Sequence, residues 1–82
     1  MKSFNHVYIL VSDLDPDRHY TGLTEDLQGR LKAHNAGQVS HTAKHKPWRI
    51  ETTISFRSPT KARDFETYLK SHSGRVFASK RF

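Results

Sequence analysis

Five side chains have the types and spacing of a set that could break a phosphodiester bond: Tyr8, Tyr20, Arg30, His34 and Glu66. The planar donors of an arginine match phosphate oxygens, and phosphoryl transfer is catalysed mainly by positioning and charge stabilisation. A tyrosine or histidine can move a proton, and a carboxylate can hold a divalent cation. The set therefore combines acid/base groups, a cation and a metal ligand.

Each of these residues also has an ordinary structural interpretation. Glu66 lies at the edge of an apolar helical stripe, where it could form an ion pair with Lys70 one turn later. Arg30 could be a solvated helix residue, since most helix charges face water. His34, one turn after Arg30, could be a buried or capping histidine, a proton donor to a leaving group, or a phosphate contact.

The two tyrosines lie on the predicted arms of a hairpin, where cross-strand aromatic packing is frequent. A free tyrosine has a pKa near 10 and is a poor base alone. A nearby cation and a metal-bound water would help it to accept a proton. Of the two, Tyr8 is favoured as the general base.

The elements that must position these side chains follow the order β-β-α-β-α. Residues 5–11 and 18–24 form the hairpin, because β-branched and aromatic residues flank a turn of Ser, Asp and Pro. Gly22 inside the second strand indicates close approach of a backbone or a ligand. Thr24 is the expected N-cap of a helix over 25–36 that Gly37 ends, and Gly29 is a mild defect in it.

The second half begins with a basic loop over 37–47. Residues 48–56 then alternate with a period of two, which predicts a strand with one apolar face. Ser58 caps a helix that starts with Pro59, runs to about residue 71 or 72 and ends before Gly74. The expected buried stripe of this helix is Ala62, Phe65, Tyr68 and Leu69. Val76 and Phe77 are expected to pack a final short turn onto the core.

This order predicts one α+β domain over residues 1–82, with a small, mostly antiparallel three-stranded sheet flanked by helices. The remaining residues at the end allow a short final helix. The position of the third strand stays open. The chain has no cysteine, which excludes disulfides and thiolate metal sites and favours a cytoplasmic location. The N-terminal apolar run is too short for a signal segment or a membrane span.

The chain carries a net charge of +6 and a pI near 10, which favours a polyanionic partner such as nucleic acid over a membrane. His41 and His45 are spaced for zinc, but no cysteine or third close ligand accompanies them. A phosphate-facing role is favoured instead. The residues expected to contact nucleic acid are Gly22, Lys32, Asn35, His41, Lys44, His45, Lys46 and Arg49.

In order and spacing, residues 6–77 resemble the small stand-alone proteins of the GIY-YIG nuclease superfamily, and are also similar to the nuclease domain of the bacterial excision-repair machinery. The resemblance rests on Val7-Tyr8-Ile9-Leu10, Tyr20-Thr21-Gly22, Arg30, His34-Asn35-Ala36-Gly37 and Lys61-Ala62 through Glu66. It implies that Glu66 binds a single divalent ion, Mg²⁺ or Mn²⁺, and that Arg30 stabilises the charge on the phosphate. Magnesium often takes only one or two protein carboxylates, with waters and phosphate oxygens completing its shell.

The chain departs from the family pattern at His6, where a glycine is usual, at Thr21, and at Gly29, where a basic residue is frequent. The extra DNA-binding domain of many relatives is not expected here. The resemblance implies a metal-dependent DNA endonuclease, acting on branched, flapped or nicked DNA in repair. The alternatives are a nucleic-acid-binding module of the same fold without turnover, and an interaction protein that supports a larger repair nuclease. A partner protein could supply substrate specificity.

Overall fold

Three strands form one antiparallel sheet, in the order β2-β1-β3. In this computed structural model, which describes residues 4–82, β1 spans Asn5–Ser12, β2 His19–Thr24 and β3 Trp48–Phe56. Residues 1–3, which were included in the predicted domain and in its N-terminal segment, lie outside the described range. The predicted α+β class and the antiparallel sheet are confirmed, and β1 is the central strand.

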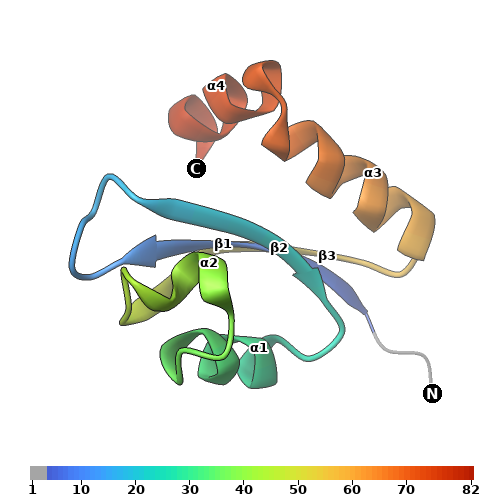
Figure 1. Cartoon of the computed structure of the whole chain (residues 1–82). Helices are drawn as coiled ribbons and strands as arrows, with labels where there is room; N and C mark the ends of the chain where they lie inside the picture. The colour runs from blue at the N-terminus through green and yellow to red at the C-terminus, as the bar shows by residue number, and fades with distance from the viewer. Residues whose placement is uncertain (1–3) are drawn as a thin grey trace.

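Within residues 4–82, four helices cover the two faces of the sheet (Figure 1). On one face lie α1, Leu27–Asn35, and the short α2, Ser40–Ala43. On the other lie α3, Pro59–Lys70, and α4, His72–Arg81. Between residues 4 and 82, no helix is both long and apolar enough to cross a membrane.

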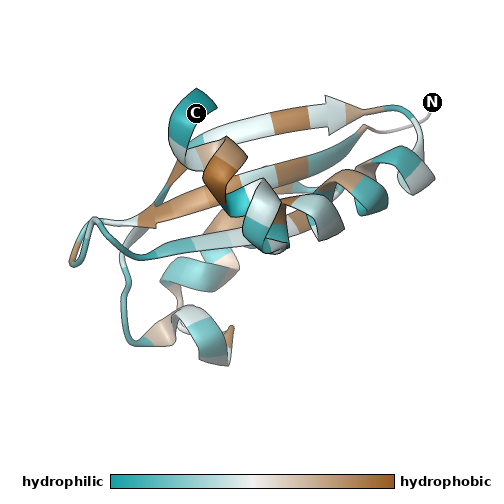
Figure 2. Ribbon diagram, turned by 90° about the horizontal axis from the view of Figure 1, so that it is seen from above, coloured by the Kyte–Doolittle hydropathy of each residue, from teal (hydrophilic) through white to brown (hydrophobic). Residues whose placement is uncertain are grey.

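The central strand β1 is buried on both of its faces. Val7 and Ile9 pack towards α3 with Ala62, while Tyr8 and Leu10 pack towards α1. Figure 2 shows apolar segments both in the strands and in the helices that cover them. The nearly continuous apolar run of β1 is what burial on two faces requires.

A bulge in β3 divides its apolar residues between the two faces. The consecutive residues Ile9 and Leu10 pair with Thr52 and Ile50, so Glu51 is an extra residue in β3. An extra residue reverses the side-chain alternation that follows it. The prediction of a single apolar face is therefore wrong. The apolar residues of β3 that pack with the α1-side cluster are Trp48 and Ile50, and the one that packs with the α3-side cluster is Phe56.

Helix α1 begins two residues later than predicted. Its N-cap is Asp26, whose carboxylate accepts a hydrogen bond from the Gly29 N–H at 3.0 Å, and not Thr24. A Cβ at Gly29 would collide with that carboxylate, so Gly29 makes room for the cap. Gly37 follows the helix with φ +77°, which confirms it as the left-handed terminating residue.

The predicted loop over residues 37–47 contains helix α2, which the sequence did not indicate. One helical turn of four residues is too short to show a periodic pattern. Its one fully buried side chain is Thr42, which is 1% exposed. This segment therefore has a fixed contact with the rest of the domain.

At the C-terminal end, a second full helix replaces the predicted short turn. Ser58 caps α3 as expected, but Gly74 does not end it. Ser71 both ends α3 and caps α4, accepting the Gly74 N–H at 3.1 Å. A Cβ at Gly74 would collide with the carbonyl oxygen of Tyr68, so this glycine allows α4 to fold back over α3. Within the predicted stripe and final turn, Ala62 and Leu69 are buried and Phe65 and Phe77 half-buried, whereas the exposed members are Tyr68 and Val76, at 41% each.

Candidate active site

The ring of Tyr8 lies directly over the backbone of Gly22. The two residues are partners in the β1–β2 ladder, and a Cβ at Gly22 would collide with the Cζ and hydroxyl of Tyr8. The close approach expected at Gly22 is therefore made by a tyrosine of the same chain. Because the glycine has no side chain, the Tyr8 hydroxyl can reach across β2 while the residue stays only 1% exposed.

Three aromatic rings gather around this point. Tyr20 pairs with Leu10, so it is a diagonal and not a direct neighbour of Tyr8. The ring centroids of Tyr8 and Tyr20 lie 6.3 Å apart, and that of His34 on α1 lies 4.8 Å from Tyr20. Side chains in diagonal positions on one face of a sheet are within reach of each other when they are aromatic.

His34 is fully buried and uses both ring nitrogens. Its Nε2 lies 3.1 Å from the Tyr8 hydroxyl, and its Nδ1 lies 2.8 Å from the hydroxyl of Thr42. Burial, and secondarily the positive charge of Arg30, lower the pKa of His34 below its usual value. The imidazole is therefore neutral at pH 7, and it contacts Tyr8 by a hydrogen bond and Tyr20 by ring packing.

The electrostatic surroundings of Tyr8 come from the remaining predicted residues. Burial is the main cause that raises the pKa of its hydroxyl, and the neighbouring guanidinium of Arg30 lowers it in part. The charges of Tyr20 and Glu66 raise this pKa further, while the charge of Arg30 lowers it. Tyr8 is therefore protonated at neutral pH. The structure brings the five predicted residues into one electrostatic group.

Glu66 projects from α3 and is largely covered, with 18% of its side chain exposed. It forms an ion pair with Lys70, one turn later, at 2.9 Å. The ordinary interpretation of this glutamate is thus present in the structure. The same carboxylate also acts on the Tyr8 hydroxyl, so the ion pair and a role in the site are compatible.

The donor atoms suit magnesium better than zinc. Within residues 4–82, no group of three or more His, Asp or Glu side chains is placed to hold a metal ion, which includes His41 and His45. A site built on Glu66 alone would draw its other ligands from water and phosphate oxygens. Magnesium accepts such a shell, whereas structural zinc sites use four protein ligands.

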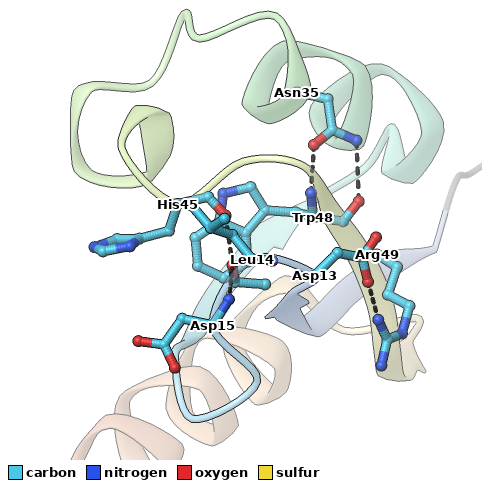
Figure 3. A network of polar contacts seen from close by, with 8 residues as sticks. Asp13, Leu14, Asp15, Asn35, His45, Trp48 and Arg49 are labelled. Atoms are coloured by element: carbon cyan, nitrogen blue, oxygen red, sulfur yellow. Dashed lines mark hydrogen bonds and ion pairs between the residues drawn. The ribbon is translucent and has the colours of Figure 1, made fainter.

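Most residues predicted to contact nucleic acid lie on the surface beside α1 and α2. His45 is half-buried, and Arg49 pairs with Asp13 (Figure 3). Gly22 is buried, and the exposed members of this group are Lys32, Asn35, His41, Lys44, Lys46 and Arg49. These positions leave the predicted contacts with phosphate sterically open.

Asn35 has an internal role that the sequence did not indicate. Its Oδ1 accepts the main-chain N–H of Trp48 at 2.6 Å, and its Nδ2 donates to the Trp48 carbonyl at 3.0 Å (Figure 3). The end of α1 is thereby joined to the start of β3. A contact of Asn35 with nucleic acid, as predicted, would have to share these polar atoms.

Thr42 and Trp48 are the residues of the site that sequence reasoning missed. The indole N–H of Trp48 donates to the Thr42 carbonyl at 2.8 Å, and Thr42 contacts His34. The sequence pattern indicates Trp48 only as an apolar strand residue, and it places Thr42 in a loop. The signal available in the sequence is that Thr42 and Trp48 follow closely after the His34-Asn35 pair.

The fold agrees with the comparisons to known proteins. Residues 4–80 match the GIY-YIG catalytic domain family. The chain is also 34% identical over 70 residues to a UPF0213 protein of Halobacterium salinarum, a match that covers 84% of this chain and 88% of that protein. The chain therefore belongs to the GIY-YIG family. This is a family of nucleases that act on DNA and generally use a divalent metal.

Proposed function

We propose that this protein is a divalent-metal-dependent endonuclease that hydrolyses phosphodiester bonds of DNA. The observation that carries the proposal is the buried contact between the Tyr8 hydroxyl and His34 Nε2, with Arg30, Tyr20 and Glu66 close enough to act on that hydroxyl. Membership of the GIY-YIG family supports it.

In the proposed mechanism, Tyr8 is the general base. A protonated phenol with a raised pKa can accept a proton from water only if it releases its own. The neutral Nε2 of His34, at 3.1 Å, is the acceptor for that proton. Tyr8 thus takes up the proton of the attacking water while its own proton moves to His34.

Arg30 and Tyr20 complete the proton and charge handling. The guanidinium of Arg30 stabilises the additional negative charge of the pentacovalent phosphate, because phosphoryl transfer depends mainly on electrostatic stabilisation. Its positive charge, which lowers the pKa of the Tyr8 hydroxyl, also favours the phenolate as it forms. Tyr20, whose ring packs against His34, orients the water beside Tyr8.

Glu66 is the residue that would hold the metal. A bound Mg²⁺ or Mn²⁺ would lower the pKa of a coordinated water and neutralise charge on the phosphate. In the absence of substrate, the carboxylate is paired with Lys70 at 2.9 Å.

The proposed substrates are branched, flapped or nicked forms of DNA in repair. Basic side chains beside α1 and α2, among them Lys32, Lys44 and Lys46, would hold the backbone without reading bases. We place the protein in the cytoplasm, because a chain without cysteine forms no disulfide and needs no oxidising compartment. A partner protein would add specificity for one DNA structure.

The test is cleavage of labelled duplex, single-stranded, flap and four-way-junction DNA with Mg²⁺, Mn²⁺ or EDTA. Wild type should cut in a metal-dependent way, and Glu66→Ala and Tyr8→Phe should lose at least about a hundredfold in rate. Lys70→Ala is the matched control, because it removes the partner of Glu66 but leaves the carboxylate. Equal cutting by Glu66→Ala and wild type would refute the proposed metal role.

One observation favours a second candidate, a nucleic-acid-binding module without turnover. Glu66 already has a charged partner at 2.9 Å, so its burial is explained without a metal. This candidate predicts salt-sensitive DNA binding by wild type and Glu66→Ala alike, with no cleavage of any DNA in the panel. Cleavage that depends on the divalent ion would exclude it.

A further inference from the structure

Thr42 lies behind His34, on the side away from Tyr8. Its hydroxyl oxygen is 2.8 Å from His34 Nδ1 and 3.2 Å from the carbonyl oxygen of Val39. A carbonyl can only accept, so the single hydroxyl proton of Thr42 is directed to Val39. The lone pairs of the Thr42 oxygen are then left to accept a hydrogen bond from the Nδ1–H group of His34.

The opposite nitrogen of His34 has a complementary arrangement. His34 is 0% exposed, and the neighbour of its Nε2 is the Tyr8 hydroxyl. Tyr8 is protonated, and its hydroxyl lies 3.1 Å from Nε2, so its proton can point at that nitrogen. Both sides of the ring therefore favour the same tautomer, with the proton on Nδ1 and a free lone pair on Nε2.

Helix α2 is held so that this contact is fixed in position. The buried Trp48 donates its indole N–H to the Thr42 carbonyl at 2.8 Å. The main chain of Trp48 is in turn bonded to Asn35, the residue that follows His34. His34 and Thr42 are thus both anchored to Trp48, and α2 cannot move without breaking buried hydrogen bonds.

We propose that Thr42 is a positioning residue that fixes the Nδ1–H tautomer of His34, so that Nε2 can receive the proton of Tyr8. The inference rests on the proposed nuclease function. As Tyr8 takes a proton from water, its own proton passes to Nε2, and the resulting imidazolium keeps its Nδ1–H bond to Thr42. The proton returns to Tyr8 when Tyr8 protonates the leaving oxygen or solvent.

The tautomer can be measured without any cleavage. In the full-length protein labelled with ¹⁵N, the shifts of the two ring nitrogens distinguish a protonated nitrogen from an unprotonated one, and His34→Gln assigns the His34 signals. We expect Nδ1 protonated and Nε2 unprotonated in wild type and in Thr42→Ser. Thr42→Val, which keeps the shape but removes the acceptor, should show a mixture or the reversed tautomer. An Nε2-protonated His34 in wild type would overturn the inference, even if Thr42→Val failed to fold.

Cleavage then tests the consequence for the reaction. Thr42→Val should cut about tenfold to a hundredfold more slowly than wild type, as for other partners that orient a functional histidine, while Thr42→Ser should recover most of the rate. Wild-type rates in a Thr42→Val protein with a changed tautomer would overturn the inference and leave the nuclease intact. If wild type cuts no DNA, the proposed function fails and the positioning role with it, while the spectra still decide the tautomer.

Discussion

At the residue scale, the site depends on Gly22, which has no side chain, as much as on the side chains around it. Gly22 stands opposite Tyr8 in the β1–β2 ladder, and the ring of Tyr8 fills the space that a Cβ would need. In the second motif, Tyr20-Thr21-Gly22, the middle residue can therefore vary, as Thr21 shows, whereas the glycine cannot. His6, in contrast, occupies the glycine position of the first motif, is half-buried and contacts Ser55 at 2.7 Å.

Gly22→Ala is expected to destabilise the fold by about 1–3 kcal/mol, because the new methyl group must displace the Tyr8 ring. It should also weaken cleavage by moving the Tyr8 hydroxyl from His34. Urea unfolding measures the first effect. Gly29→Ala is the matched control: its Cβ would displace the Asp26 cap carboxylate, at a cost of about 1 kcal/mol, but alanine gains about 1 kcal/mol over glycine in a helix, so net stability should change little.

His34 should make stability fall in mild acid. Its pKa in the folded state lies below the unfolded value of about 6.5, so the unfolded chain binds the proton more readily. The contribution is fully present above about pH 6.5 and is lost as the pH falls towards the lowered folded-state pKa. We expect the unfolding free energy to decrease between about pH 7.5 and 5 by more in wild type than in His34→Gln. Parallel curves for the two proteins would contradict this.

At the element scale, the junction between α1 and β3 holds the site together. Asn35 bonds both main-chain polar groups of Trp48 (Figure 3). The indole N–H of Trp48 in turn donates to the carbonyl of Thr42 in α2. One side chain therefore sets the distance between a helix that carries catalytic candidates and the strand that supports α2.

Asn35→Ala is expected to cost about 1–3 kcal/mol in unfolding free energy, because it leaves buried polar groups of Trp48 without partners. Trp48 fluorescence during urea unfolding reports the change, and faster hydrogen exchange at the Trp48 amide should accompany it. Gln38→Ala, at an exposed position just after α1, should be close to neutral. An Asn35→Ala protein as stable as wild type would show that the contact is not needed for the junction.

Local signals in the sequence predicted the hairpin, the Ser58 cap and the third strand. The five candidate site residues lie in one electrostatic group, and their catalytic roles stay predictions. The differences come from contacts between distant segments. A one-residue bulge at Glu51 depends on the pairing of β3 with β1 and leaves the alternating pattern unchanged. Gly74 resembles a helix terminator, but its reason is the carbonyl of Tyr68 in the preceding helix. Thr42 has a role only because α2 lies against His34.

At the scale of the whole molecule, the sheet separates two helical layers with different expected roles. The layer of α1 and α2 adjoins the Tyr8–His34 contact and the basic residues that follow α2, while α4 covers the other face (Figure 1). Net charge alone would attract DNA to the whole surface. Under the proposed function, DNA binding should depend instead on the basic residues of the α1–α2 layer.

Replacing Lys44 and Lys46 together by Gln should weaken DNA binding and reduce the slope of log Kobs against log salt by about two. The matched control replaces Lys80 and Arg81 by Gln, two exposed cations at the end of α4 that remove the same charge. It should leave the slope within about half a unit of wild type, since these groups lie on the far layer. Affinities measured by fluorescence anisotropy over a range of salt concentrations test both pairs. Equal losses in the two double variants would mean that DNA responds to net charge only, and the α1–α2 layer would then have no special claim as the DNA-binding face.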